Sequence, residues 1–213
     1  MDTRMASQLA ASGFRSAIIV MLMLCSSCGI SRGTINSYVE PTYEQGAIKR
    51  LALFPIRNAG RAPSEARDIN VKIAQAISTK NPGVDIVAPA ASVRTINDAG
   101  LADKWANFVE DYYTSGIANK VILKDIATAL NVDGILQGQL VNVWQQDGDG
   151  WARKGQTRIT VSFSIVETAT GKQVWEASAD GIKGNATELG SAPAIAEAIE
   201  LAIAKIVENI PAL

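Results

Sequence analysis

Apolar and polar residues follow helix-like and strand-like periods along most of the chain, beginning near residue 48. Short apolar runs bounded by turn residues predict strands at 49–56 and 84–87. Pro55 indicates that the first strand ends there or follows a sheet edge, because proline cannot donate a ladder hydrogen bond. Apolar residues that recur every three or four positions predict amphipathic helices. These helices are expected over 65–78, 92–99, 101–113 and 121–130.

Two of these helices have well-defined apolar faces. In the helix at 65–78, the residues on this face are Ala66, Ile69, Ile73 and Ile77. In the helix at 101–113, they are Leu101, Trp105, Phe108 and Tyr112. Because each set covers one side of a helix, both helices are expected to bury that side in a core.

The hydrophobic period changes to two at residue 134, which predicts antiparallel strands at 134–145, 157–167 and 173–179. The second strand is expected to bury one face and leave the other wetter, with these residues inward: Ile159, Val161, Phe163 and Ile165. A long helix is predicted over 191–210. The element order β-α-β-α-α-α-β-β-β-α therefore predicts an α/β fold with a single mixed β-sheet of about five strands packed with helices.

The amino-terminal segment has the pattern of a targeting sequence. Arg4 and Arg15 precede an apolar run at 17–24. A membrane-spanning helix needs about 20 apolar residues, so this run is too short to span and fits the apolar region of a secretory signal peptide. The other interpretation is a buried amphipathic helix of the mature fold.

Residues 24–28, Leu-Cys-Ser-Ser-Cys, resemble a bacterial lipobox. The resemblance implies cleavage after Ser27, so that residues 1–27 form a lipoprotein signal peptide and Cys28 becomes the acylated first residue. Cys25 fits less well because it follows Leu24 directly. A disulfide between Cys25 and Cys28 is the competing interpretation.

The segment after the lipobox is polar and has no sustained period. Residues 28–46 are therefore predicted to form the acylated cysteine and a flexible tether, and residues 47–213 a periplasmic α/β domain. Gly29 follows the cysteine, and the resemblance to lipoproteins implies that such a chain is lipid-anchored in the outer membrane with its domain facing the periplasm.

Composition narrows the chemistry. The chain of 213 residues is 47% hydrophobic and 19% charged, with a formal net charge of −1 and no histidine. Ser-His-Asp catalysis, His-ligated zinc and His-ligated haem are therefore excluded. No cofactor or metal is expected, and the absence of a basic excess makes nucleic acid an unsuitable partner.

Three stretches resemble the TolB amino-terminal-like family of envelope lipoproteins, which includes the curli secretion lipoprotein and the penicillin-binding-protein activator lipoprotein. They are Leu-Ala-Leu-Phe-Pro at 51–55, Ala-Leu-Asn-Val-Asp-Gly-Ile-Leu-Gln-Gly at 129–138, and Ser-Ile-Val-Glu-Thr-Ala-Thr-Gly-Lys-Gln-Val-Trp at 164–175. The resemblance implies a binding or assembly protein rather than an enzyme.

Three functions follow as hypotheses. The first is a protein-binding or ring-forming module in an envelope assembly or secretion apparatus, with other envelope proteins or further copies as partners. The second is an activator lipoprotein that stimulates a peptidoglycan synthase by direct contact. The third is a hydrolase that uses carboxylates alone, although the neighbouring Glu110 and Asp111 point apart on a helix.

A hairpin tip is the candidate partner-binding site, formed by Trp144, Trp151, Arg153 and Lys154. Exposed Trp and Arg favour interfaces. A turn at Asp147-Gly148 would place Trp144 opposite Trp151, so that the pair only stabilises the hairpin. A turn at Asp149-Gly150 would place Trp144 opposite Gly155, Leu136 opposite Phe163 and Leu140 opposite Ile159. The Asp-Gly sequence predicts a turn and not a calcium loop, because the later ligands are missing.

Overall fold

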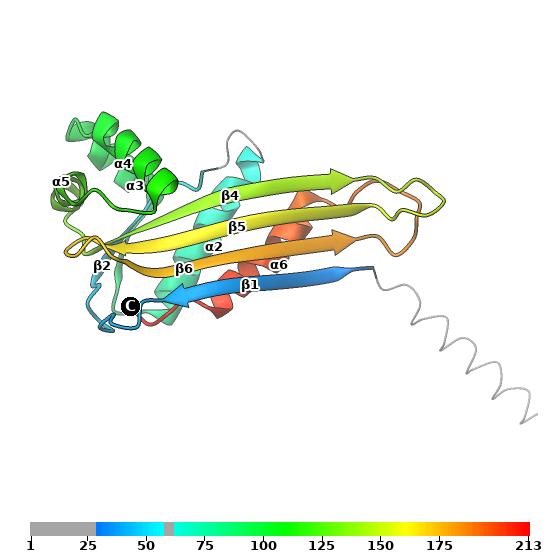
Figure 1. The fold of residues 1–213 in the computed structure, drawn as a ribbon, viewed down its shortest axis with the longest axis horizontal. Helices are drawn as coiled ribbons and strands as arrows, with labels where there is room; N and C mark the ends of the chain where they lie inside the picture. The colour runs from blue at the N-terminus through cyan, green and yellow to red at the C-terminus, as the bar shows by residue number, and fades with distance from the viewer. Residues whose placement is uncertain (1–28, 58–61) are drawn as a thin grey trace, which may run out of the picture.

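The computed structural model describes residues 29–57 and 62–213. Its strands form one mixed sheet in the order β1-β6-β5-β4-β2-β3 (Figure 1). The neighbouring pairs β1–β6, β6–β5 and β5–β4 are antiparallel, whereas β2 pairs in parallel with both β4 and β3. The strands are β1 Ser31–Val39, β2 Arg50–Leu53, β3 Asp85–Val87, β4 Gly134–Gln146, β5 Gln156–Glu167 and β6 Gln173–Gly184.

Helices cover the two faces of the sheet unequally (Figure 1). One face packs against α2 and α6 in the larger apolar core. The other is covered only at one end, where α3, α4 and α5 form a second core over β2 and the start of β4. The helices are α2 Pro63–Lys80, α3 Pro89–Asp98, α4 Ala102–Ser115, α5 Lys120–Leu130 and α6 Ile195–Glu208.

The larger core depends on a close approach between α6 and the sheet. A Cβ atom at Gly181 in β6 would overlap the carbonyl oxygen of Ala198 in α6. Ala198 and Ala202 are both fully buried at this contact. Gly33 in β1 faces the same helix, because a Cβ there would lie 2.7 Å from the Leu201 carbonyl oxygen. Small residues on both sides therefore set the distance between helix and sheet.

The α/β fold with one mixed sheet is confirmed, and so are the predicted inward faces of two helices. The buried residues of α2 are the predicted four, Ala66, Ile69, Ile73 and Ile77. In α4, Phe108 and Tyr112 are buried, and Leu101 and Trp105 pack against the same core. The inward residues predicted for β5 are also buried. Strong local periodicity is sufficient to predict the buried faces of these elements.

The prediction of a flexible tether over 28–46 is wrong for β1. Residues 31–39 pair with β6 along their whole length, from Ser31 opposite Lys183 to Val39 opposite Trp175. This strand adds the sixth member to a sheet expected to have about five. Its sequence is polar and its partner lies far away in the chain, so no local pattern indicated the pairing. The predicted signal peptide over 1–27, together with Cys25 and Cys28, lies outside the described residues.

Some element ends also differ from prediction. β2 stops at Leu53 rather than continuing to Ile56, while β6 continues to Gly184 instead of ending at Ala179. The longer β6 matches the length of β5 and supplies the partner residues for the start of β1. The last helix begins at Ile195, after Pro193, and not at Ser191.

We predict that Gly181→Ala lowers the free energy of unfolding by about 1–3 kcal/mol, because α6 must move away from β6 to accommodate the methyl group. Urea denaturation measures the change. Gly83→Ala is the matched control, since a Cβ there meets no atom within 4 Å. Equal midpoints for the two variants would contradict the close contact.

Candidate functional site

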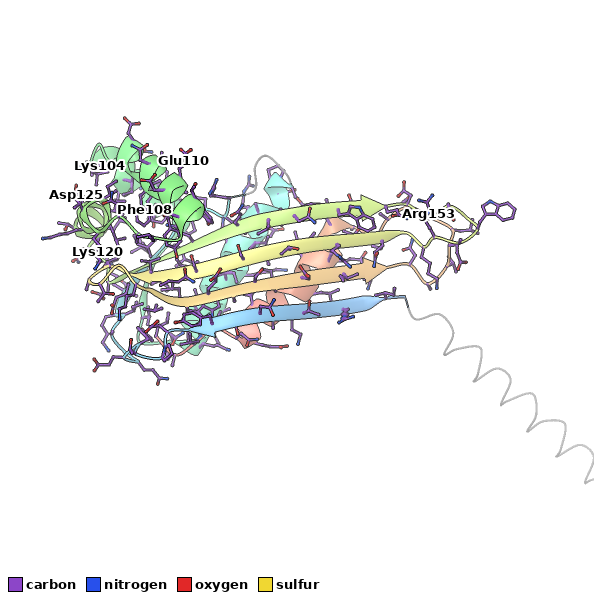
Figure 2. The ribbon with its side chains drawn as sticks, in the orientation of Figure 1. Lys104, Phe108, Glu110, Lys120, Asp125 and Arg153 are labelled. Atoms are coloured by element: carbon purple, nitrogen blue, oxygen red, sulfur yellow. The ribbon has the colours of Figure 1, made fainter. Side chains whose placement is uncertain are left out.

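The long strands separate two ends of the molecule. β4 contains 13 residues, whereas β5 and β6 contain 12 each, and all three extend well beyond the α3–α5 layer (Figure 1). Figure 2 shows Arg153 at one end and Lys104, Phe108, Glu110, Lys120 and Asp125 at the other. We call the first of these the tip, formed by residues 147–155 and 185–192.

Hydrogen bonds connect the two segments of the tip. The Gly148 amide donates to the Gly190 carbonyl at 3.0 Å, and the Gly150 amide donates to the Glu188 carbonyl at 3.0 Å. The Asp147 carboxylate accepts from the Ala192 amide at 2.7 Å. The β4–β5 connection is therefore a folded loop supported by the chain that follows β6.

Asp149 organises the end of this loop. Its Oδ1 atom accepts from the amides of Trp151, Ala152 and Arg153 at 2.9–3.0 Å. Its Oδ2 atom accepts from Arg153 Nε at 2.8 Å. The Arg153 side chain and then these backbone amides stabilise the charged carboxylate, so they hold the pKa of Asp149 well below its usual range.

The tip presents large apolar side chains to solvent. Trp151 is 93% exposed and Leu189 is 74% exposed. Cationic groups lie in the same loop, where Arg153 pairs with Asp149 and Lys154 Nζ donates to the Ala186 carbonyl at 2.7 Å. Trp151, Arg153 and Lys154 thus share the tip, as the sequence predicted, although their binding role stays a prediction.

Both predicted hairpin registers are wrong, and Trp144 does not pair with Trp151. Trp144 lies opposite Arg158 in the regular ladder, while Trp151 belongs to the loop beyond it. The ladder also pairs Leu136 with Ile165 and Leu140 with Val161. Hydrogen bonds from backbone amides to the Asp149 carboxylate hold the connection as a loop longer than two residues. A bulge between Leu140 and Asn142 also shifts the register of the β4–β5 ladder.

The beginning of β1 lies at the same end as the tip. The Ile30 carbonyl accepts a hydrogen bond from the Gly184 amide at 2.7 Å. Ser31 is opposite Lys183, which is in turn opposite Thr157 near the start of β5. The chain therefore enters the sheet beside the tip and only three positions after Cys28.

The face of the sheet opposite α6 carries rows of polar side chains. Thr160 lies between Asn142 and Asp180, and its hydroxyl donates to the Asp180 carboxylate at 2.6 Å. The next row toward the helical end contains Gln139, Ser162, Ser178 and Asn36. This is the wetter face that the alternation in β5 predicted, extended over four strands.

β1 forms one edge of the sheet. The Ile30 carbonyl and the Glu40 amide both bond toward β6. Because inward and outward backbone groups alternate along an antiparallel strand, the odd-numbered residues Gly33, Ile35 and Ser37 direct their N–H and C=O groups to the open side. A further strand can pair there without disturbing the existing sheet.

The described ranges contain no helix that is long and apolar enough to cross a membrane. Within the same ranges, no group of three or more His, Cys, Asp or Glu residues is placed to hold a metal ion. Glu110 and Asp111 are both exposed on α4 and do not form a buried acid–base pair.

No family model matches the chain, and no curated protein matches it. Solved structures with a similar arrangement include the PelC dodecamer from Paraburkholderia phytofirmans, which is 15% identical with a TM-score of 0.49 over 82% of this chain and 94% of that one. Lipoprotein GNA1162 from Neisseria meningitidis is 14% identical, with a TM-score of 0.48 over 76% and 99%.

The LpoB C-terminal domain from Escherichia coli is 12% identical, with a TM-score of 0.39 over 67% of this chain and 87% of that one. These likenesses concern the general arrangement of the chain.

We predict that Asp149→Ala exposes the amides of Trp151, Ala152 and Arg153 and accelerates their hydrogen exchange several-fold. Asp149→Asn, which keeps one acceptor oxygen, should cause a smaller increase. Because the pKa of Asp149 is lowered on folding, this stabilisation persists down to about pH 4 and is lost as the pH falls through the folded value. Unchanged exchange in both variants would contradict the role of the carboxylate.

Proposed function

We propose that the protein is an envelope lipoprotein, anchored in the outer membrane through Cys28, whose periplasmic domain binds proteins or further copies of itself. The observation that carries this proposal is β1, a strand of nine residues that starts beside the anchor position and leaves one edge open. Open strand edges bind partners by adding a strand, with backbone hydrogen bonds supplying affinity.

The short distance between Cys28 and β1 would orient the domain. Only Gly29 and Ile30 separate them, so an acylated Cys28 lies within about 10 Å of the start of the sheet. The tip would then be close to the membrane surface. Trp151 and the cations Arg153 and Lys154 suit such a surface, because indole and cationic side chains favour the lipid headgroup region.

In the same orientation, the other surfaces of the domain would face the periplasm. The strands carry the α3–α5 layer away from the end that holds the tip (Figure 1). The rows of polar side chains on β1, β4, β5 and β6 lie between the two ends. A partner that adds a strand to β1 also borders this polar face, since Asn36 and Thr34 belong to both. Repetition of such a contact between copies would produce a ring if the rotation closes.

We predict that Cys28→Ala releases the protein from the membrane fraction. Cell fractionation would show the loss, and mass spectrometry of the wild-type amino terminus would show an acylated Cys28 as the first residue. Cys25→Ala is the control and should remain at the membrane. A wild-type amino terminus without acyl chains would contradict the anchoring proposal.

Assembly through β1 has a separate test. Ser37→Pro removes an outward-facing N–H, which an edge strand tolerates but an added strand needs. Light scattering of the detergent-solubilised protein should show a multimer for the wild type and for Ser37→Ala, and a smaller species for Ser37→Pro. A wild-type monomer would contradict the ring and leave direct contact with another envelope protein.

A further inference from the structure

A polar pocket lies between the carboxyl-terminal turns of α4 and the open face of β4, β5 and β6, at the helical end of the molecule. Its volume is about 220 Å³. Its walls include Tyr112, Tyr113, Gln137, Ser162, Ser164 and Glu176. No residue in the predicted candidate site lines it, so it is distinct from the tip.

Gln137 sets this pocket apart from an ordinary surface hollow. The side chain is 3% exposed, and neither Oε1 nor Nε2 has a hydrogen-bond partner among the described residues. Burial of an unpaired amide is costly, and buried amides in folded proteins nearly always find a partner. The unpaired amide of Gln137 is therefore the group in this pocket whose hydrogen bonds a bound polar molecule could complete.

The surrounding polar groups are held in place by one another. The Tyr112 hydroxyl donates to Gln173 Oε1. Gln173 Nε2 in turn donates to Glu176 Oε2 at 2.7 Å. The guanidinium carbon of Arg57 lies 4.3 Å from the centre of the Tyr113 ring. These contacts fix both tyrosines and the carboxylate before any ligand arrives, which lowers the entropy lost on binding.

The lining indicates the chemistry of the ligand. Among the described residues, no lysine or arginine lines the pocket, so a phosphate or carboxylate finds no cation there. A single carboxylate, two serine hydroxyls and a free amide instead offer donors and acceptors to a neutral molecule with several hydroxyl groups. The volume equals that of about seven water molecules in the liquid, which is sufficient for one sugar ring.

A wider groove continues from the pocket. It shares Gly116, Gln173 and Glu176 with the pocket, has a volume of about 560 Å³, and extends toward Tyr38 and Lys120. A second sugar joined to the first could lie there. We propose that the pocket binds one residue of a neutral saccharide through the Gln137 amide, and that the groove receives the next residue. This site does not depend on the anchoring through Cys28.

Saturation-transfer NMR and calorimetry test the proposal on the full-length protein in zwitterionic detergent, which contributes no sugar. The probes are glucose, N-acetylglucosamine and the β-1,4-linked disaccharide of each. N-acetylglycinamide and inorganic phosphate represent a peptide and an anion. At least one saccharide should bind, with its disaccharide tighter than the single sugar. Binding of none of the saccharides, with water alone in the pocket, would overturn the proposal, as would preference for the peptide probe.

Gln137→Met separates binding from folding. It keeps the length of the side chain and removes the amide, so affinity for the saccharide should fall at least about ten-fold, a typical result of losing a buried polar contact. The melting temperature should stay the same or rise, because an unpaired amide is no longer buried. Gln139→Met, on the same face of β4 but outside the pocket, is the control and should bind normally.

A purely structural role for Gln137 gives the opposite result. Under that role, Gln137→Met lowers the melting temperature and leaves the saccharide affinity unchanged in the fraction that remains folded. Equal affinity for Gln137→Met and the wild type would therefore overturn the assignment, even if other residues of the groove bind a sugar.

Discussion

The close contact of α6 with the sheet is the constraint on which the rest of the structure depends. Because Gly181 and Gly33 have no side chain, the Ala198 carbonyl can lie against β6 and the Leu201 carbonyl against β1. One helix therefore packs on both strands. With α6 and α2 covering this face, the apolar residues of β5 and β6 are buried without a second full layer. The opposite face can therefore remain polar over much of its length, and this is the face that carries the pocket and the rows of hydroxyl and amide groups.

Because β4, β5 and β6 are long, the two ends of the sheet are well separated and carry different structures. At one end, local hydrogen bonds to Asp149 shape a loop that keeps Trp151 in solvent. At the other, the second core supports α4 above the sheet, where Tyr112 and Tyr113 form the roof of a pocket. Loop residues at the tip contribute little to either core, so changes there and changes in the pocket should act independently.

Elements with strong local periodicity could be predicted from the sequence, and those that depend on distant pairing could not. The face of α2 from Ala66 to Ile77 follows from spacing alone. β1 needs β6, which lies more than a hundred residues later, and its polar composition resembles that of a tether. The Asp-Gly turn signal indicated a connection after β4 but not the Asp149 cap that lengthens it. The wetter face of β5 was foreseen, whereas the pocket formed with α4 was not.

Gln137 and Thr160 lie on the same polar face but differ in their hydrogen bonding. The Thr160 hydroxyl donates to Asp180, so its presence is explained by contacts within the sheet. Gln137 has no such contact with any residue that the structure describes, and the apolar cavity that it also borders, beside Phe54 and Trp105, would suit a hydrophobic side chain. Folding alone favours an apolar residue at this position. A bound polar molecule supplies the hydrogen bonds that the fold leaves unmade, and it thereby accounts for an amide that packing does not explain.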